Sequence, residues 1–105
     1  MSYLPFNTVV YNRDLVPLGG INCAIYLSTL LYRYREWSVS EGWMLLNVDL
    51  IQCITGLDPE EQRVARIILR DQGIIRDGMA FDEPAMCIDL NKVNEFLDGV
   101  ATDDY

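Results

Sequence analysis

The segment from residue 47 to residue 76 constrains the fold of this 105-residue chain more than any other part of it. Asn47 is a good N-cap for a short helix over Val48–Thr55, and Gly56 can adopt the left-handed conformation that commonly ends a helix. A second helix over Pro59–Gln72 follows almost at once, and the residues after it are extended. The sequence therefore predicts helix, tight turn, helix and strand in succession, an arrangement that presents one helix outward to a partner.

The second helix carries strong start and stop signals. Asp58 is a suitable N-cap, Pro59 suits the first helical position, and Glu61 stands where a capping box needs it. Gly73 is expected to end the helix. At about 100° per residue, one side of the helix is apolar and is expected to face the core; it consists of Val64, Ala65, Ile68 and Leu69.

Three arginines occupy the opposite side of this helix. Arg63, Arg66 and Arg70 fall within roughly 60° of one another. A row of arginines suits phosphates and guanine edges, and the amide of Gln62 suits adenine. The alternative is an ordinary solvated face, which Glu60 supports because it stands three residues before Arg63. The candidate nucleic-acid-binding residues are Gln62, Arg63, Arg66, Arg70 and Arg76.

The net charge of −8 is the main objection to a nucleic-acid role. Residues 77–105 hold eight acids and one base, a sum of −7, whereas residues 1–76 hold eight acids and seven arginines, a sum of −1. The acids are thus concentrated at the C-terminal end, and four of the seven arginines lie in or just after the second helix. We expect weak, salt-sensitive binding of double-stranded DNA, because the overall field repels a duplex.

The reactive side chains of the sequence exclude most enzyme classes. The chain has no histidine, so it has no Ser-His-Asp or Cys-His arrangement, and it has no Gly-rich phosphate loop. Its three cysteines, Cys23, Cys53 and Cys87, form no CxxC pair. We therefore expect no enzymatic activity, no metal site and no cofactor. The odd number of cysteines and their apolar neighbours predict buried, reduced thiols.

The composition favours a compact cytoplasmic protein. Half of the residues are hydrophobic, so a packed fold is expected rather than disorder. No apolar run approaches the ~20 residues of a transmembrane helix, and no membrane partner is expected. The first residues lack the charged and apolar regions of a signal peptide.

The segment Ile21–Trp37 is expected to form one long helix, preceded by an N-terminal arm at residues 1–18. Apolar residues occupy two opposite sides of this helix, so both sides must be buried. One side can cover the two helices that follow in the sequence. We expect the other side to form a homodimer interface; the alternative is that residues 3–18 fold over it.

The remaining elements predict a small three-stranded sheet. Residues 38–42 are expected to form a polar loop, and Trp43–Leu46 a short strand that leads into the short helix. The extended residues Ile74–Arg76 and a strand at residues 86–88 are expected to form a hairpin, joined by a long loop over residues 77–84 that begins with Asp-Gly.

Asp89 can cap a final helix over Leu90–Leu97, and an acidic flexible tail is expected at residues 99–105. The expected fold is therefore a single α+β domain, mainly α, over residues 1–98.

Several short motifs resemble those of winged helix-turn-helix domains. Trp43 stands in the strand that follows the first helix, and Thr55-Gly56-Leu57 ends the short helix. Leu69 and Gly73-Ile74-Ile75 lead into the hairpin. The chain is most similar to the N-terminal domains of phage and plasmid replication proteins and to small bacterial transcriptional regulators. The resemblance covers about residues 20–97.

The resemblance implies a three-helix core, a small β-hairpin called the wing, and a C-terminal helix. It also implies that the second helix of the motif faces DNA through Gln62, Arg63, Arg66 and Arg70. The wing departs from the family pattern because its loop holds three acids and no base. A wing that enters the minor groove usually needs arginine or lysine, so no such contact is expected.

The leading hypothesis is a small double-stranded DNA-binding protein, a transcriptional regulator or replication accessory of a phage or bacterium, that uses the helix Pro59–Gln72. The alternative is a winged helix that binds a protein partner without binding DNA, as the net charge and the acidic wing favour. A third possibility is an acidic decoy that mimics DNA, which the row of arginines contradicts.

Overall fold

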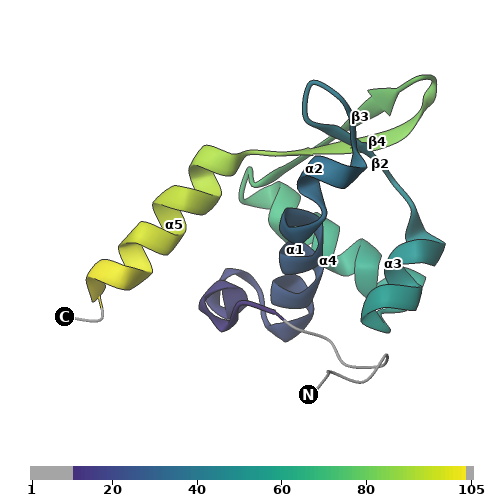
Figure 1. Cartoon of the computed structure of the whole chain (residues 1–105). Coiled ribbons are helices and arrows are strands. Elements are labelled where there is room, and N and C mark those ends of the chain that lie inside the picture. The colour runs from purple at the N-terminus through teal and green to yellow at the C-terminus, as the bar shows by residue number, and fades with distance from the viewer. Residues whose placement is uncertain (1–10, 104–105) are drawn as a thin grey trace, which may run out of the picture.

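The computed structural model describes the backbone of residues 11–103 and the side chains of residues 11–99 (Figure 1). This part of the chain is an α+β fold, mainly helical, with a four-stranded antiparallel sheet. The helices are η1 (a 3₁₀ helix, Arg13–Leu18), α1 (Ile21–Tyr32), α2 (Tyr34–Trp37), α3 (Val48–Thr55), α4 (Pro59–Asp71) and α5 (Leu90–Asp103). The strands are β1 (Ser38–Ser40), β2 (Trp43–Leu45), β3 (Ile75–Ala80) and β4 (Glu83–Ile88).

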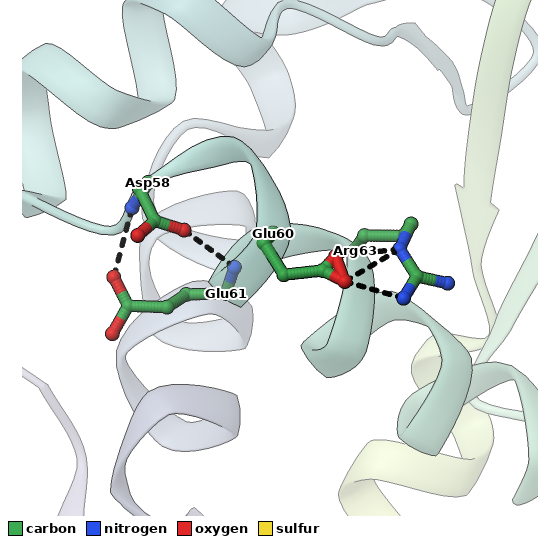
Figure 2. Close-up of polar contacts among 4 residues, drawn as sticks. All are labelled: Asp58, Glu60, Glu61 and Arg63. Carbon is green, nitrogen blue, oxygen red and sulfur yellow. Dashed lines mark hydrogen bonds and ion pairs between the residues drawn. The ribbon is translucent and has the colours of Figure 1, made fainter.

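Local capping sets the boundaries of α3 and α4, as the sequence predicts. The side chain of Asn47 accepts a hydrogen bond from the Leu50 amide at 3.1 Å, and Gly56 ends α3 in the left-handed conformation at φ 79°. Asp58 and Glu61 form a capping box, each side chain accepting from the other's backbone amide (Figure 2). Leu57, in the turn between the two helices, is buried in the core.

The sheet has one strand more than expected. Its strand order is β1-β2-β4-β3, and every pair is antiparallel. The prediction of a loop over residues 38–42 is wrong, because Ser38–Ser40 pairs with β2 across a two-residue turn at Glu41 and Gly42. Both turn residues have positive φ, as tight hairpin turns require. The polar composition is compatible with a strand because β1 lies at the edge of the sheet.

The second hairpin is tighter than expected. Ala80 pairs with Glu83, so the turn consists of Phe81 and Asp82 alone, both with positive φ. The predicted long loop over residues 77–84 is therefore wrong. Gly78 lies inside β3, where a Cβ atom would stand 2.6 Å from the ring of Trp43. Packing across the sheet, and not a turn, accounts for glycine at this position.

The first long helix is interrupted at Arg33, where φ is −96° and ψ is 6°. It is therefore two helices, α1 and the single turn α2. The second apolar side of α1 is covered by η1, whose Leu15 and Leu18 are buried in the core. This contact covers part of that side, as the alternative to a homodimer predicts, but Ile21 and Tyr32 at its two ends stay exposed, so the homodimer stays a prediction. Residues 1–10 of the predicted arm lie outside the described part. The largest fully buried side chains include Tyr26, Leu27 and Leu30 of α1, together with Leu15, Met44, Ile51, Leu69, Ile75 and Met86.

The C-terminal helix α5 begins as predicted but continues further. Asp89 caps it by accepting from the Lys92 amide at 3.1 Å. The expected end at Leu97 is wrong, because the helix extends to Asp103 and takes up most of the predicted tail; residues 104–105 lie outside the described part. Val93 is buried and α5 contacts η1, while the C-terminal end of α5 projects from the body of the domain (Figure 1).

Candidate nucleic-acid interface

One side of helix α4 packs against the core, and the other side is exposed. The helix packs against α1 and α3, and the side chains it buries are Gln62, Ala65 and Leu69. Arg63 and Arg70 are exposed, and Arg66 is half-buried. The capping box and Pro59 fix where the helix starts, and therefore which residues face outward.

Gln62 does not face outward, contrary to the expectation from sequence. It is fully buried, and its Nε2 atom donates to the carbonyl oxygens of Val48 at 3.0 Å and of Leu57 at 2.9 Å. These bonds tie the start of α4 to the start of α3 and to the turn between them. The periodicity contained the signal, because Gln62 is seven residues before Leu69 and so nearly in line with it on the helix.

Arg63 is exposed but already bound to a carboxylate. Its Nε atom donates to Glu60 at 2.8 Å and 3.2 Å, and a terminal nitrogen binds the same carboxylate (Figure 2). The hydrogen bond between the two side chains lowers the pKa of Glu60 and raises the pKa of Arg63. The pair lies within one turn of the helix, as the solvated-face interpretation predicted.

Arg66 leans toward the core and donates to the hydroxyl of Tyr26 at 3.4 Å. Burial raises the pKa of Tyr26, and the hydrogen bond from Arg66 opposes that rise. Within residues 11–99, no carboxylate pairs with Arg66. Its charge is therefore the least compensated of the three.

Arg70 joins α4 to the hairpin. Its guanidinium lies 3.2 Å from the carboxylate of Asp77 on β3 and 3.9 Å from that of Asp71. Arg76 stands one residue before Asp77 and therefore on the opposite face of the sheet. There its guanidinium lies 5.8 Å from the centroid of the Trp43 ring. The structure thus brings Arg63, Arg66 and Arg70 together and leaves Arg76 apart from them.

The exposed arginines are balanced by carboxylates of the same surface. We call Arg63, Arg66 and Arg70 the arginine row; Glu60, Asp71 and Asp77 lie beside it, so the local sum is 3 − 3 = 0. Exposed ion pairs of this kind are weak, because water and salt screen the charges. The guanidinium groups can therefore exchange their partners for phosphate at small cost, but little net positive field attracts a duplex.

The cysteines differ from one another in exposure. All three are free, with Cys23 and Cys87 buried, and burial raises the pKa of the Cys23 thiol. Cys53 is exposed, so the expectation that all three are buried is wrong for this residue. It stands on the outer side of α3, where an apolar neighbourhood in sequence does not imply burial.

Among the described residues, no cluster of histidine, cysteine, aspartate and glutamate could hold a metal ion. Nor does any helix within residues 11–103 combine the length and apolar character that crossing a membrane requires. Comparison of the sequence with protein-family models finds no match, and comparisons with curated proteins and with solved structures find none that is significant.

Proposed function

We propose that this domain is a winged helix-turn-helix. The order α1, β2, α3, α4, β3, β4 and the sheet order β2-β4-β3 support it, because the two last strands form a hairpin beside the outward helix. The tight turn at Gly56 and the anchoring bonds of Gln62 support it further, since they fix α4 against α3. In this interpretation β3 and β4 are the wing, and β1 is an additional edge strand.

We further propose that the domain binds double-stranded DNA through the arginine row of α4. The observation that carries this proposal is the position of three arginines on one side of the helix that such a fold presents. Their ion pairs are exposed and therefore weak enough to exchange for phosphates. The guanidinium group can bind phosphate with two parallel hydrogen bonds, as that of Arg63 already binds the Glu60 carboxylate.

The number of arginines in the row sets how strongly DNA binding is expected to depend on salt. Three phosphate contacts correspond to a slope of about −2.7 in a plot of log affinity against log salt. Raising the salt from about 50 to 200 mM should then weaken binding about 40-fold. Because Glu60, Asp71 and Asp77 surround the row, affinity for a single domain is expected to be low.

The test is a fluorescence-anisotropy titration of a short mixed-sequence duplex at both salt concentrations. Wild type is compared with a variant in which Arg63, Arg66 and Arg70 are replaced by alanine. A matched control replaces Arg13, Arg33 and Arg35, which removes the same charge away from α4. We expect the row variant alone to lose the salt-dependent binding. Equal losses in both variants, or no loss in either, would refute DNA binding by this helix.

A second candidate function is the binding of a protein partner through the same surface. The charge balance of the arginine row favours it, because compensated charges make directional contacts without attracting a polyanion. The tip of the wing favours it too: Met79 and Phe81 are exposed there beside the acids Asp82 and Glu83. Absence of DNA binding at about 50 mM salt, in a titration that reaches millimolar protein, would favour this second function.

A further inference from the structure

An apolar cavity of about 460 Å³ opens between the start of α1 and the middle of α4. Ile21 and Cys23 line it from α1, and Val64, Ala65 and Ile68 line it from α4. Its volume lies within the ~300–1,000 Å³ typical of ligand pockets. Two of its apolar walls are exposed, Ile21 at 52% and Val64 at 43%, so a binding partner could cover them.

Tight packing at the edge of the cavity requires a glycine. Gly19 lies at its edge, where a Cβ atom would stand 2.5 Å from Ile68 and 2.8 Å from the sulfur of Cys23. Any side chain at residue 19 would therefore push these neighbours apart. The apolar walls come from segments about 40 residues apart in the sequence, so only the folded chain assembles them.

The rim of the cavity is acidic. Glu60 and Glu61 line it from the first turn of α4. Each already accepts hydrogen bonds within the chain: Glu60 from Arg63, and Glu61 from the Asp58 amide and, at 3.4 Å, from Asn22. An ionised carboxylate offers about four acceptor positions, so each retains capacity for a further donor.

The cavity lies on the side of α4 opposite Arg66 and Arg70, whereas Arg63 reaches the rim of the cavity through its ion pair with Glu60. Val64 and Ile68 each stand two residues before a member of the row, Arg66 and Arg70, which is a rotation of about 200° around the helix. An acidic, apolar cavity does not suit a nucleic acid. The two sides of α4 can therefore serve different partners.

We propose that this cavity binds a short segment of a partner protein that combines an aliphatic or aromatic side chain with an adjacent lysine or arginine. The apolar side chain enters between Ile21 and Val64, and the cation binds the carboxylates of Glu60 and Glu61. The occupant is a different protein and not a second copy of this chain, since a net charge of −8 makes two copies repel. The same charge attracts basic segments.

The experiment selects binders from a random library of displayed dodecapeptides against the immobilised full chain. Enriched peptides are synthesised, and their affinities are measured by fluorescence anisotropy. Val64→Ser removes an apolar wall, and Val39→Ser is its control, because Val39 is equally exposed (42%) but lies on β1. Glu60→Gln removes a rim charge, and Glu83→Gln on β4 matches its change in net charge.

We expect the enriched peptides to share a hydrophobic residue next to a base. Val64→Ser should weaken them at least about tenfold, and Glu60→Gln about threefold to fivefold, while both controls leave affinity unchanged. Failure to enrich any peptide, enrichment of peptides without a base, or equal binding by Val64→Ser would each overturn the proposal. Replacing only Arg66 and Arg70 by alanine keeps the Glu60–Arg63 pair at the rim. This variant should bind the peptides normally, so the result is independent of DNA binding.

Discussion

Replacing Gln62 tests whether the turn between α3 and α4 depends on a buried amide. Its Nε2 atom makes two hydrogen bonds to backbone carbonyls, and its Oε1 atom has no partner among the described residues. Gln62→Ala removes both bonds and leaves a cavity, whereas Gln62→Met keeps most of the volume. Methionine also removes the unsatisfied oxygen, which partly offsets the lost bonds.

These differences give distinct expected magnitudes. Two lost hydrogen bonds correspond to about 2 kcal/mol, and burying the Leu57 carbonyl without a partner adds about 1 kcal/mol or more. Methionine lacks the unsatisfied Oε1 atom, and this offsets the penalty of the unpaired carbonyl, so we expect Gln62→Met to cost about 2 kcal/mol. The cavity left by Gln62→Ala adds about 2 kcal/mol, for a total of about 4 kcal/mol.

The assay is urea unfolding followed by circular dichroism and by the fluorescence of Trp37 and Trp43. A loss below about 0.5 kcal/mol in Gln62→Ala would show that the amide is not buried as described. So would a greater loss in Gln62→Met than in Gln62→Ala. Gln62→Met should also bind DNA as wild type does wherever it is folded. A specific loss of DNA affinity would return Gln62 to the binding surface.

Three further predictions concern the sheet, the arginine row and the cysteines. Gly78→Ala forces a Cβ atom against the Trp43 ring, so we expect a loss of about 1–3 kcal/mol in urea unfolding; unchanged stability would contradict the packing across the sheet. Asp77→Asn releases Arg70 from its ion pair and should raise the affinity for DNA up to about fivefold. The control Glu95→Gln on α5 removes the same charge and should raise the affinity less. Equal gains would show that only the net charge matters. Cys53 should react with a thiol reagent in the native state well before the two buried thiols, and uniform reaction would contradict their burial.

Local interactions explain why the sequence predicted α3 and α4 so closely. The cap at Asn47, the left-handed Gly56 and the capping box of Asp58 and Glu61 all join residues within about one helical turn. The Glu60–Arg63 pair is equally local and was anticipated as the ordinary alternative for the arginine row. Interactions of this range are readable from the order of residues alone.

Packing between distant segments explains the two positions, Gly78 and Gln62, at which the prediction from sequence was wrong. Asp77-Gly78 has the composition of a turn, but Gly78 pairs with Ala85 inside a strand, and the Trp43 ring leaves no room there for a side chain. Gln62 has a polar side chain, yet two carbonyl groups from the preceding helix and turn satisfy its amide inside the core. Trp43 stands 35 residues before Gly78, and Val48 stands 14 residues before Gln62, so these partners lie well beyond one helical turn along the chain.

The order of residues is enough to specify the two capped helices, the row of arginines and the uneven distribution of charge. Each depends only on residue identity and on spacings of a few residues. Contacts between distant parts of the chain place η1 on α1 and bring the carboxylate of Asp77 on β3 to the arginine row. They also bring Ile21 and Val64 together around an acidic cavity. Such contacts require the whole chain to close on itself, so the local pattern of residues does not specify them.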